Sequence, residues 1–119
     1  MDKTENSKQY DLEKRTFEFA KNVRNYVKLL PKTLSNIEYG KQLIRSSGSV
    51  GANYIEANES LSRKDFGMRV KISRKEVKES RYWLNLSEPS GSLVKERDAL
   101  VAESNQLMKI FGSIIEKVK

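Results

Sequence analysis

The side chains in this sequence that could perform chemistry are mainly carboxylates and amines, because the chain contains no His and no Cys. Glu56, Glu76 and Glu79 could suggest a carboxylate metal site of the ferritin type, but each such site also needs a Glu-x-x-His pair. The same absence removes Ser-His-Asp and Cys-His nucleophile pairs, disulfides, and zinc sites built on imidazole or thiolate. We therefore expect no enzyme activity, no cofactor and no metal.

The most uneven charge in the chain lies in residues 63–81, where eight basic residues stand against three acidic ones, a net charge of +5. On a helix, most of these cations fall on one outward strip and Glu76 and Glu79 on the opposite flank. One cation per turn suits a phosphate backbone, because each neutralised phosphate releases counterions. The residues predicted to bind nucleic acid are Arg63, Lys64, Lys71, Arg74, Lys75, Lys78, Arg81 and Tyr82. The alternative is an ordinary solvated helix face.

The opposite flank combines apolar and acidic residues. Ile72 and Trp83 lie there among Glu76 and Glu79, and Trp is enriched at protein interfaces. We expect these four residues to meet another subunit, unless Trp83 only covers the end of the fold. Three further polar residues are assigned a structural role inside the bundle, where buried polar groups need partners: Arg45, Asn53 and Glu56.

Four amphipathic helices are predicted to position these residues. The first runs from Leu12 until Pro31 stops it, and the second follows the turn 31–36, with Ser35 or Asn36 as its N-cap. The inward face of the second helix is predicted to contain Ile37, Gly40, Ile44, Ser47, Gly51 and Tyr54. Its small residues include Gly, which costs up to about 1 kcal/mol relative to Ala in a helix. We therefore expect a closely packed neighbour there.

The third helix is predicted to begin at Ser62, which caps it, with Asp65 in the first turn. Residues 87–92 (SEPSGS) break it. Its inward face is expected to contain Phe66, Val70, Ser73, Val77, Ser80 and Leu84. The last helix has the clearest period, alternating three and four residues from Arg97 to Val118, which is typical of left-handed bundle packing. The fold class is thus an all-α, antiparallel, up-down-up-down four-helix bundle.

Length and charge place limits on the class of protein. A chain of 119 residues fits one domain, which we assign to residues 11–119 after a polar tail at residues 1–10. No run of about 18 apolar residues is present, and residues 1–14 are too charged for a secretory signal. We expect a soluble, cytoplasmic protein without a membrane partner. Its net charge of +7 favours anionic partners.

The stretch from Gln42 to Leu86 resembles the four-helix-bundle family of proteins encoded in intervening sequences of bacterial 23S ribosomal RNA genes. The residues that carry the resemblance are Leu43, Arg45, Ser46, Ser49, Ala52, Asn53, Glu56, Ala57, Ser62, Lys64, Asp65, Phe66, Glu76, Glu79, Trp83 and Leu84. The first and last helices match in pattern only.

The resemblance implies a bacterial protein that assembles as a homopentamer. A related branch is similar to the accessory protein of diversity-generating retroelements, which works with a reverse transcriptase and binds nucleic acid through a basic surface. The family has no catalytic residues to carry over. Two functions are therefore weighed. One is a self-associating bundle that binds RNA or DNA without strong sequence preference. The other is a protein–protein adaptor that docks its partner through Trp83, Ile72 and the acidic flank, with the positive charge incidental.

Overall fold

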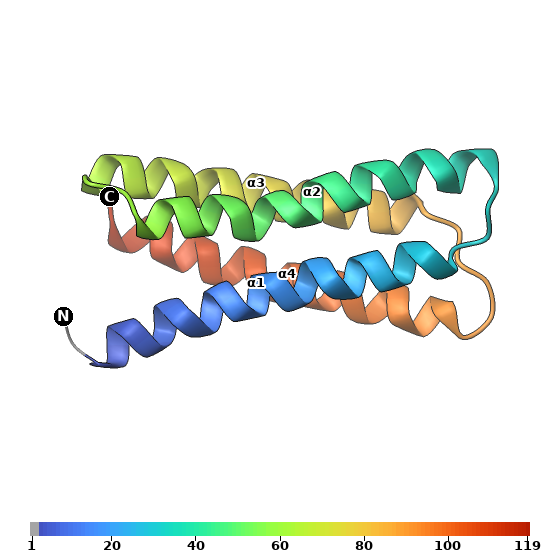
Figure 1. The fold of residues 1–119 in the computed structure, drawn as a ribbon, viewed down its shortest axis with the longest axis horizontal. Coiled ribbons are helices and arrows are strands. Elements are labelled where there is room, and N and C mark those ends of the chain that lie inside the picture. The colour runs from blue at the N-terminus through green and yellow to red at the C-terminus, as the bar shows by residue number, and fades with distance from the viewer. Residues whose placement is uncertain (1–2) are drawn as a thin grey trace.

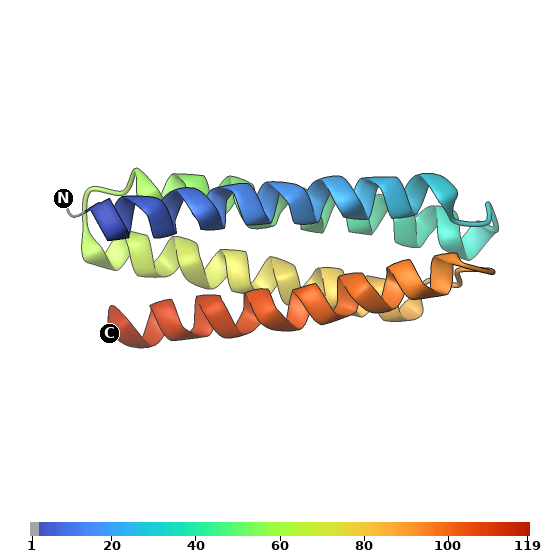
Figure 2. The ribbon, with the colours of Figure 1, turned by 90° about the horizontal axis from the view of Figure 1, so that it is seen from below.

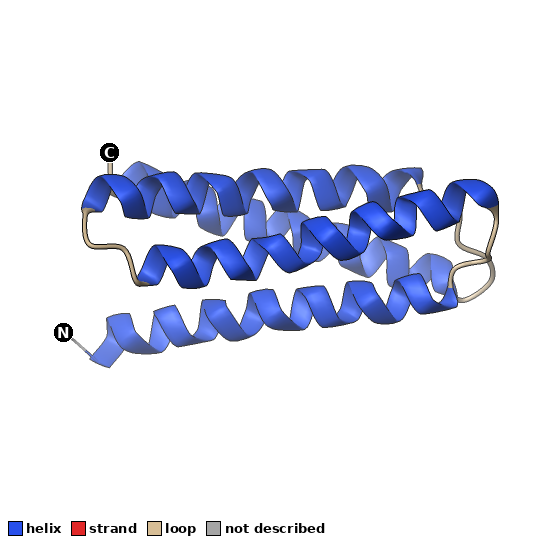
Figure 3. Ribbon diagram, turned by 45° about the horizontal axis from the view of Figure 1, so that its top comes forward, coloured by secondary structure: helices blue, strands red, loops and turns tan. Residues whose placement is uncertain are grey.

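The computed structural model describes residues 3–119, with side chains described from residue 11 onward. These residues form four antiparallel helices, which confirms the all-α four-helix bundle (Figure 1). The helices are α1 (Lys3–Leu29), α2 (Leu34–Asn58), α3 (Arg63–Leu86) and α4 (Leu93–Lys117). The α1–α2 and α3–α4 connections lie at one end, and the α2–α3 connection lies at the other (Figure 3). The bundle measures 47 × 22 × 19 Å.

Each helix packs against its two neighbours around the bundle axis. Figure 2 shows α1 and α2 on one side and α3 and α4 on the other. The closest backbone packing is between α2 and α3, and the loosest is between α1 and α4. In the part of the chain that is described, no helix combines the length and apolarity needed to span a membrane.

The core is filled by one apolar stripe from each helix, and its largest fully buried side chains include Phe19, Leu43, Leu84 and Phe111. Burying side chains of this size contributes roughly 1.5–3 kcal/mol each. The inward face predicted for α3 is confirmed from Val70 to Leu84, where all five predicted residues are buried; Phe66 is half-buried. The periodicity of α3 therefore also fixes which of its residues face outward.

The first helix begins earlier than expected. The sequence analysis assigned residues 1–10 to a polar tail, but α1 already includes Lys3; residues 1–2 lie outside the described part of the chain. Residues 3–10 contain neither Pro nor Gly. Nothing in them therefore interrupts a helix that the buried face from Leu12 onward stabilises.

The start and face of α2 also differ from the prediction. Thr33 is the N-cap, and its hydroxyl accepts a hydrogen bond from the Asn36 amide at 3.2 Å. The predicted caps, Ser35 and Asn36, both lie within the helix. Ile37 and Ile44, predicted to face inward, are each 46% exposed. The buried face of α2 is centred on Leu43, Val50 and Tyr54, and small or polar residues such as Gly40, Ser46 and Ser47 lie beside them at the contacts with α1 and α3.

The small residues of α2 do admit a close neighbour, as predicted. A Cβ on Gly40 would lie 3.0 Å from Cγ1 of Val27 in α1. Toward α3, the hydroxyls of Ser46 and Ser80 hydrogen-bond at 2.8 Å, and the Ser73 hydroxyl donates to the Val50 carbonyl at 2.9 Å. These short side chains let α2 approach both neighbours, and they satisfy one another's polar groups inside the core.

Candidate nucleic-acid interface

Helix α3 begins where the sequence predicted. The Ser62 hydroxyl accepts a hydrogen bond from the Asp65 amide at 3.1 Å. This cap satisfies one of the unpaired amides of the first turn and fixes where the helix begins. Because Val70 and Val77 are buried, the lysines between and after them point to solvent. The seven residues of the predicted strip that are exposed are Arg63, Lys64, Lys71, Arg74, Lys75, Lys78 and Tyr82.

Several of these residues follow the seam between α3 and α4. The guanidinium carbon of Arg74 would lie 3.8 Å from a Cβ placed on Gly112 of α4. Half-buried Arg81 donates from Nη1 to Oδ1 of Asn105 in α4 at 2.8 Å. Arg74 and Arg81 therefore lie beside α4, which limits the positions that these two side chains sample.

The lysines of the strip keep their charge available to a ligand. Within residues 11–119, no ion pair is formed by Lys64, Lys71, Lys75 or Lys78. A lysine that forms no close ion pair can be neutralised by a phosphate without first breaking such a pair. The arrangement therefore has the density and the freedom that binding to a polyanion requires.

Arg63 has a different role from the other members of the predicted strip. Its Nε donates to the Val118 carbonyl at 3.2 Å, and its Nη2 donates to the Lys117 carbonyl at 2.7 Å. These carbonyls belong to the last turn of α4, where helix geometry leaves them without backbone partners. Arg63 thus ties the start of α3 to the end of α4. This role does not follow from the sequence pattern, because spacing within one helix does not show which groups at the end of another helix lack hydrogen-bond partners.

Tyr82 belongs to an aromatic cluster at the far end of the strip. Its ring is 60% exposed and meets Trp83 edge-on, with centroids 5.1 Å apart. Trp83 is half-buried and stacks on Tyr39 of α2 at 5.9 Å. The sequence analysis did not single out Tyr39. Part of the Trp83 surface is therefore covered within the chain, while Tyr82 faces solvent.

The acidic flank lies on the α2 side of α3. Ile72, Glu76 and Glu79 are half-buried there. Burial raises the pKa of Glu76, and the neighbouring Glu79 raises it further, while the charges of Arg45 and Lys75 act in the opposite direction. Within the described residues, Oε2 of Glu76 is buried without a hydrogen-bond partner. A carboxylate in this position is costly to keep ionised.

The three residues predicted to have a structural polar role lie in different environments. Asn53 donates to the Ser49 carbonyl at 2.9 Å and accepts from Nη1 of Arg69 at 3.3 Å, so it is tied to both α2 and α3. Arg45 and Glu56 are exposed, and their predicted place inside the bundle is wrong, because both face outward from α2. In the described residues no cluster of three or more acidic side chains could hold a metal ion.

Comparison with known proteins identifies the family. The family model for the 23S rRNA-intervening sequence protein matches residues 8–113. This chain belongs to that family. The predicted resemblance is thereby confirmed, and the match extends well beyond the stretch 42–86 that suggested it.

A solved structure from Bacteroides thetaiotaomicron VPI-5482, described as a protein of unknown function from the S23 ribosomal protein family, is similar in sequence and fold. It is 32% identical, with a TM-score of 0.76, and the match covers 87% of this chain and 96% of that one. No curated protein matches this member of the 23S rRNA-intervening sequence protein family. The comparisons therefore identify the family and its fold, and they leave the biochemical role to be inferred from the surface.

Proposed function

We propose that this protein is a non-enzymatic, self-assembling bundle that binds RNA or DNA through the basic face of α3, largely without sequence preference. The observation that carries the proposal is the row of exposed lysines without ion pairs, Lys71, Lys75 and Lys78. They span seven residues, or roughly 10 Å along the helix. One nucleic-acid strand presents a phosphate about every 3.4 Å of axis, so the row matches a short stretch of backbone.

Self-assembly would raise the affinity of a basic face that binds nucleic acid only weakly in a single copy. When several copies of one basic face engage the same polyanion, each contact after the first becomes effectively intramolecular and overall affinity rises steeply. The pentamer implied by the family resemblance would supply that repetition, with the flank around Ile72, Glu76, Glu79 and Trp83 as the proposed subunit interface. We place the protein in the cytoplasm, where RNA and DNA are both accessible.

The composition of the exposed strip supports recognition of the nucleic-acid backbone. The exposed part of the strip is dominated by Lys, whose compact point charge suits phosphate and carries no fixed donor pattern for base edges. Affinity should therefore depend on shape and salt more than on sequence.

An adaptor function is the second candidate, and the aromatic cluster favours it. The half-buried Trp83 and exposed Tyr82 present apolar surface of the kind that protein interfaces use as anchors. The partner could be a reverse transcriptase, as in the related branch, or another protein. The affinity of such docking would change little with salt concentration, whereas the affinity for a polyanion would fall steeply as salt is added.

The experiment that tests the proposal is charge reversal with a matched control. Lys71→Glu, Lys75→Glu and Lys78→Glu together should lower affinity for an RNA hairpin and a DNA duplex by about a hundredfold or more, because phosphate contacts become repulsive. The control reverses three exposed lysines elsewhere, Lys21, Lys28 and Lys32, and changes net charge by the same amount. Its affinity should stay close to wild type. Equal losses in both variants would mean that net charge, not the α3 face, drives binding.

A further inference from the structure

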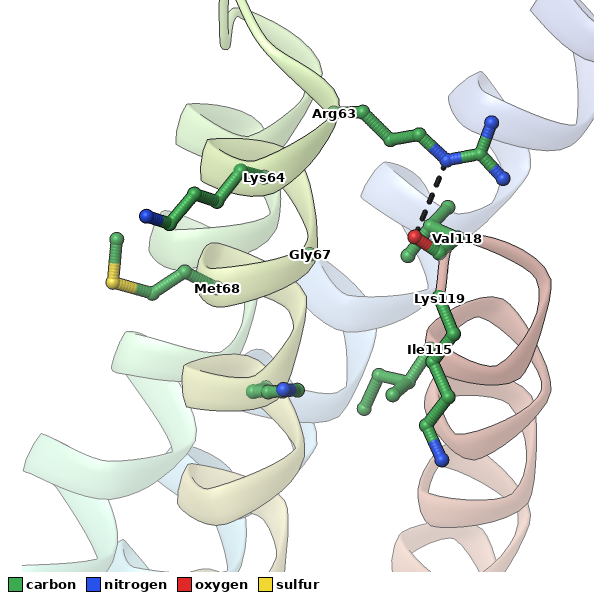
Figure 4. Close-up of a pocket in the computed structure, with 8 residues that line it drawn as sticks. Arg63, Lys64, Gly67, Met68, Ile115, Val118 and Lys119 are labelled. Carbon is green, nitrogen blue, oxygen red and sulfur yellow. Dashed lines mark hydrogen bonds between the residues drawn. The ribbon is translucent and has the colours of Figure 1, made fainter.

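The exposed apolar residues of the chain are not spread evenly. On α3, Met68 lies between Lys64 and Lys71 in the sequence, and Figure 4 shows it beside Lys64, directed away from α4. Helix α2, by contrast, has one unbroken stripe of seven exposed residues along its outer face, which ends at the C-cap. The stripe consists of Ile37, Lys41, Ile44, Gly48, Ala52, Ile55 and Glu59. Spacings of three and four residues keep all of them within about 40° of one line on the helix.

Gly48 has a different environment from the other glycines of α2. Among the described residues, a Cβ on Gly48 would meet nothing within 4 Å, whereas Gly40 and Gly51 each face a side chain of α1 closely. Gly is less favourable than Ala at an exposed position inside a helix. It becomes useful where the backbone of a second helix must come close. The stripe therefore has the shape of a helix-packing surface centred on Gly48.

The isoleucines of the stripe border open hollows on its α1 side. Ile37 and Ile44 line a hollow of about 250 Å³ between α1 and α2, together with Gly40. A second hollow of about 250 Å³ continues from Ile44 to Phe17 of α1, which is 65% exposed. An aliphatic side chain from another molecule would lose its contact with water by entering either hollow.

The charges of α2 are divided between its two halves. Lys41 and Arg45 come before Gly48, while Glu56 and Glu59 follow it, and residues 49–59 contain no Lys or Arg. All four charged side chains are exposed. Lys41 pairs with Glu38 at 3.4 Å, but both partners are exposed, and pairs of this kind are weak. An antiparallel copy of α2 would place the cationic half of each helix beside the acidic half of the other.

We propose that two copies of this protein pair through the outer stripes of their α2 helices, which run antiparallel and cross at Gly48. The stripe suits a twofold axis, because its other members lie 4, 7 and 11 residues to either side of Gly48. Ile44 then meets Ala52 of the second copy, and Lys41 meets Ile55 of the second copy. The stripe shares no residue with the α3 flank, so this contact deepens the proposed self-assembly without involving the lysine row.

The two sides of the contact differ in chemistry. Toward α1, Ile55 of the second copy falls between Ile37 and Ile44 and fills the hollow that they border. Toward α3, Glu56 of the second copy lies within reach of Lys41, because the two positions are about 1.5 Å apart along the paired helices. Each contact occurs twice in a symmetric pair. Burial of the isoleucines holds the copies together, and the ion pairs select the antiparallel direction.

Disulfide cross-linking tests the register of the two helices, because the chain contains no Cys. Protein with Lys41→Cys is mixed with protein with Ile55→Cys under a mild oxidant. The two thiols should lie opposite each other and form a cross-linked dimer about tenfold faster than either variant alone. In each variant alone the two equal positions are 14 residues, or roughly 21 Å, apart, which is too far for a disulfide. Lys109→Cys, at an exposed position of α4, controls for random collision.

Light scattering over a range of protein concentrations tests the contact itself. Gly48→Leu should weaken pairing by about tenfold or more, because the new side chain overfills the crossing point. At low concentration, where the copies are separate, this variant should be at least as stable as wild type, which excludes misfolding as the cause. Lys41→Glu and Glu56→Lys should each weaken pairing, and the two changes combined in one chain should restore it.

The outcomes separate this inference from the proposed function. If the cysteine pair cross-links no faster than the single variants, or if Gly48→Leu keeps the wild-type mass at every concentration, the α2 contact is wrong and self-assembly through the α3 flank stands. If wild type is monomeric at every concentration, both contacts fail and the stripe is left for another protein. Binding by the lysine row is tested separately, by the charge-reversal experiment.

Discussion

Gly51 of α2 faces Thr16 of α1 so closely that a Cβ on Gly51 would lie 3.0 Å from Thr16 Oγ1. Thr16 is fully buried, and its hydroxyl lies 2.9 Å from the carbonyl oxygens of both Leu12 and Glu13. The threonine side chain is therefore fixed by its own helix. This contact sets the separation of α1 and α2 halfway along the bundle.

A bulky side chain at Gly51 should force the two helices apart. We expect Gly51→Leu to lower the free energy of unfolding by about 1–3 kcal/mol or more, the usual cost of overfilling a packed core. Gly48 is the matched control, because a Cβ there would meet nothing within 4 Å. Gly48→Leu should be neutral or stabilising, since Gly is a poor helix former. Denaturant unfolding at one low protein concentration measures the stability of both variants. Equal stability of Gly51→Leu and Gly48→Leu would mean that the close contact with Thr16 is unimportant.

The two connections at one end of the bundle are joined through Asn36. Its Nδ2 donates to the Pro31 carbonyl at 2.9 Å and to the Glu88 carbonyl at 3.1 Å, and its Oδ1 accepts from the Glu88 amide at 2.9 Å. Asn36→Ala should lower the free energy of unfolding by about 1–3 kcal/mol, because three hydrogen bonds to partly buried backbone groups of Pro31 and Glu88 are lost. Hydrogen exchange should show faster exchange at the Glu88 amide. Unchanged protection there would contradict the role assigned to Asn36.

Glu76 should make stability depend on pH. Its pKa is raised above the ordinary 4.5 in the folded state, mainly by burial and then by Glu79. The folded protein therefore binds this proton more tightly than the unfolded chain. The resulting stabilisation is present below about pH 4.5 and is lost as pH rises through the raised pKa.

Glu76→Gln tests this directly, because the amide keeps the shape and cannot ionise. Between pH 5 and pH 7 its free energy of unfolding should fall less than that of wild type, and at pH 7 the variant should be at least as stable. Glu59→Gln, at an exposed position, serves as control. If the free energies of unfolding of wild type and Glu76→Gln changed in parallel with pH, burial would not be what raises the pKa of Glu76.

The sequence contained enough information for the fold and for the exposed face of α3. The period of Val70, Val77 and Leu84 predicts which side of α3 is buried, and the structure agrees. On α2, the same spacing argument placed Ile37 and Ile44 inward together with Gly40, Ser47 and Tyr54, but both isoleucines are exposed. The close approach of α1 and α3 to α2 favours glycine and serine where the helices meet. This is a tertiary effect that spacing within one helix does not reveal.

The candidate site was predictable only in part. The lysine row depends on one helix and its charge pattern, so it could be read from the sequence. The Arg63 contact with the end of α4 and the Tyr39–Trp83 stack each depend on two helices. Such features follow from how helices are placed relative to one another, which amphipathic patterns determine only loosely.

The central claim is that α3 binds nucleic acid by displacing counterions, and its most direct test is the salt dependence of duplex binding. The logarithm of the affinity of wild type should fall linearly and steeply with the logarithm of salt concentration. Successive Lys71→Ala, Lys75→Ala and Lys78→Ala changes should each reduce that slope by about one. A wild-type slope near zero, or one that the three changes leave unaltered, would contradict the account.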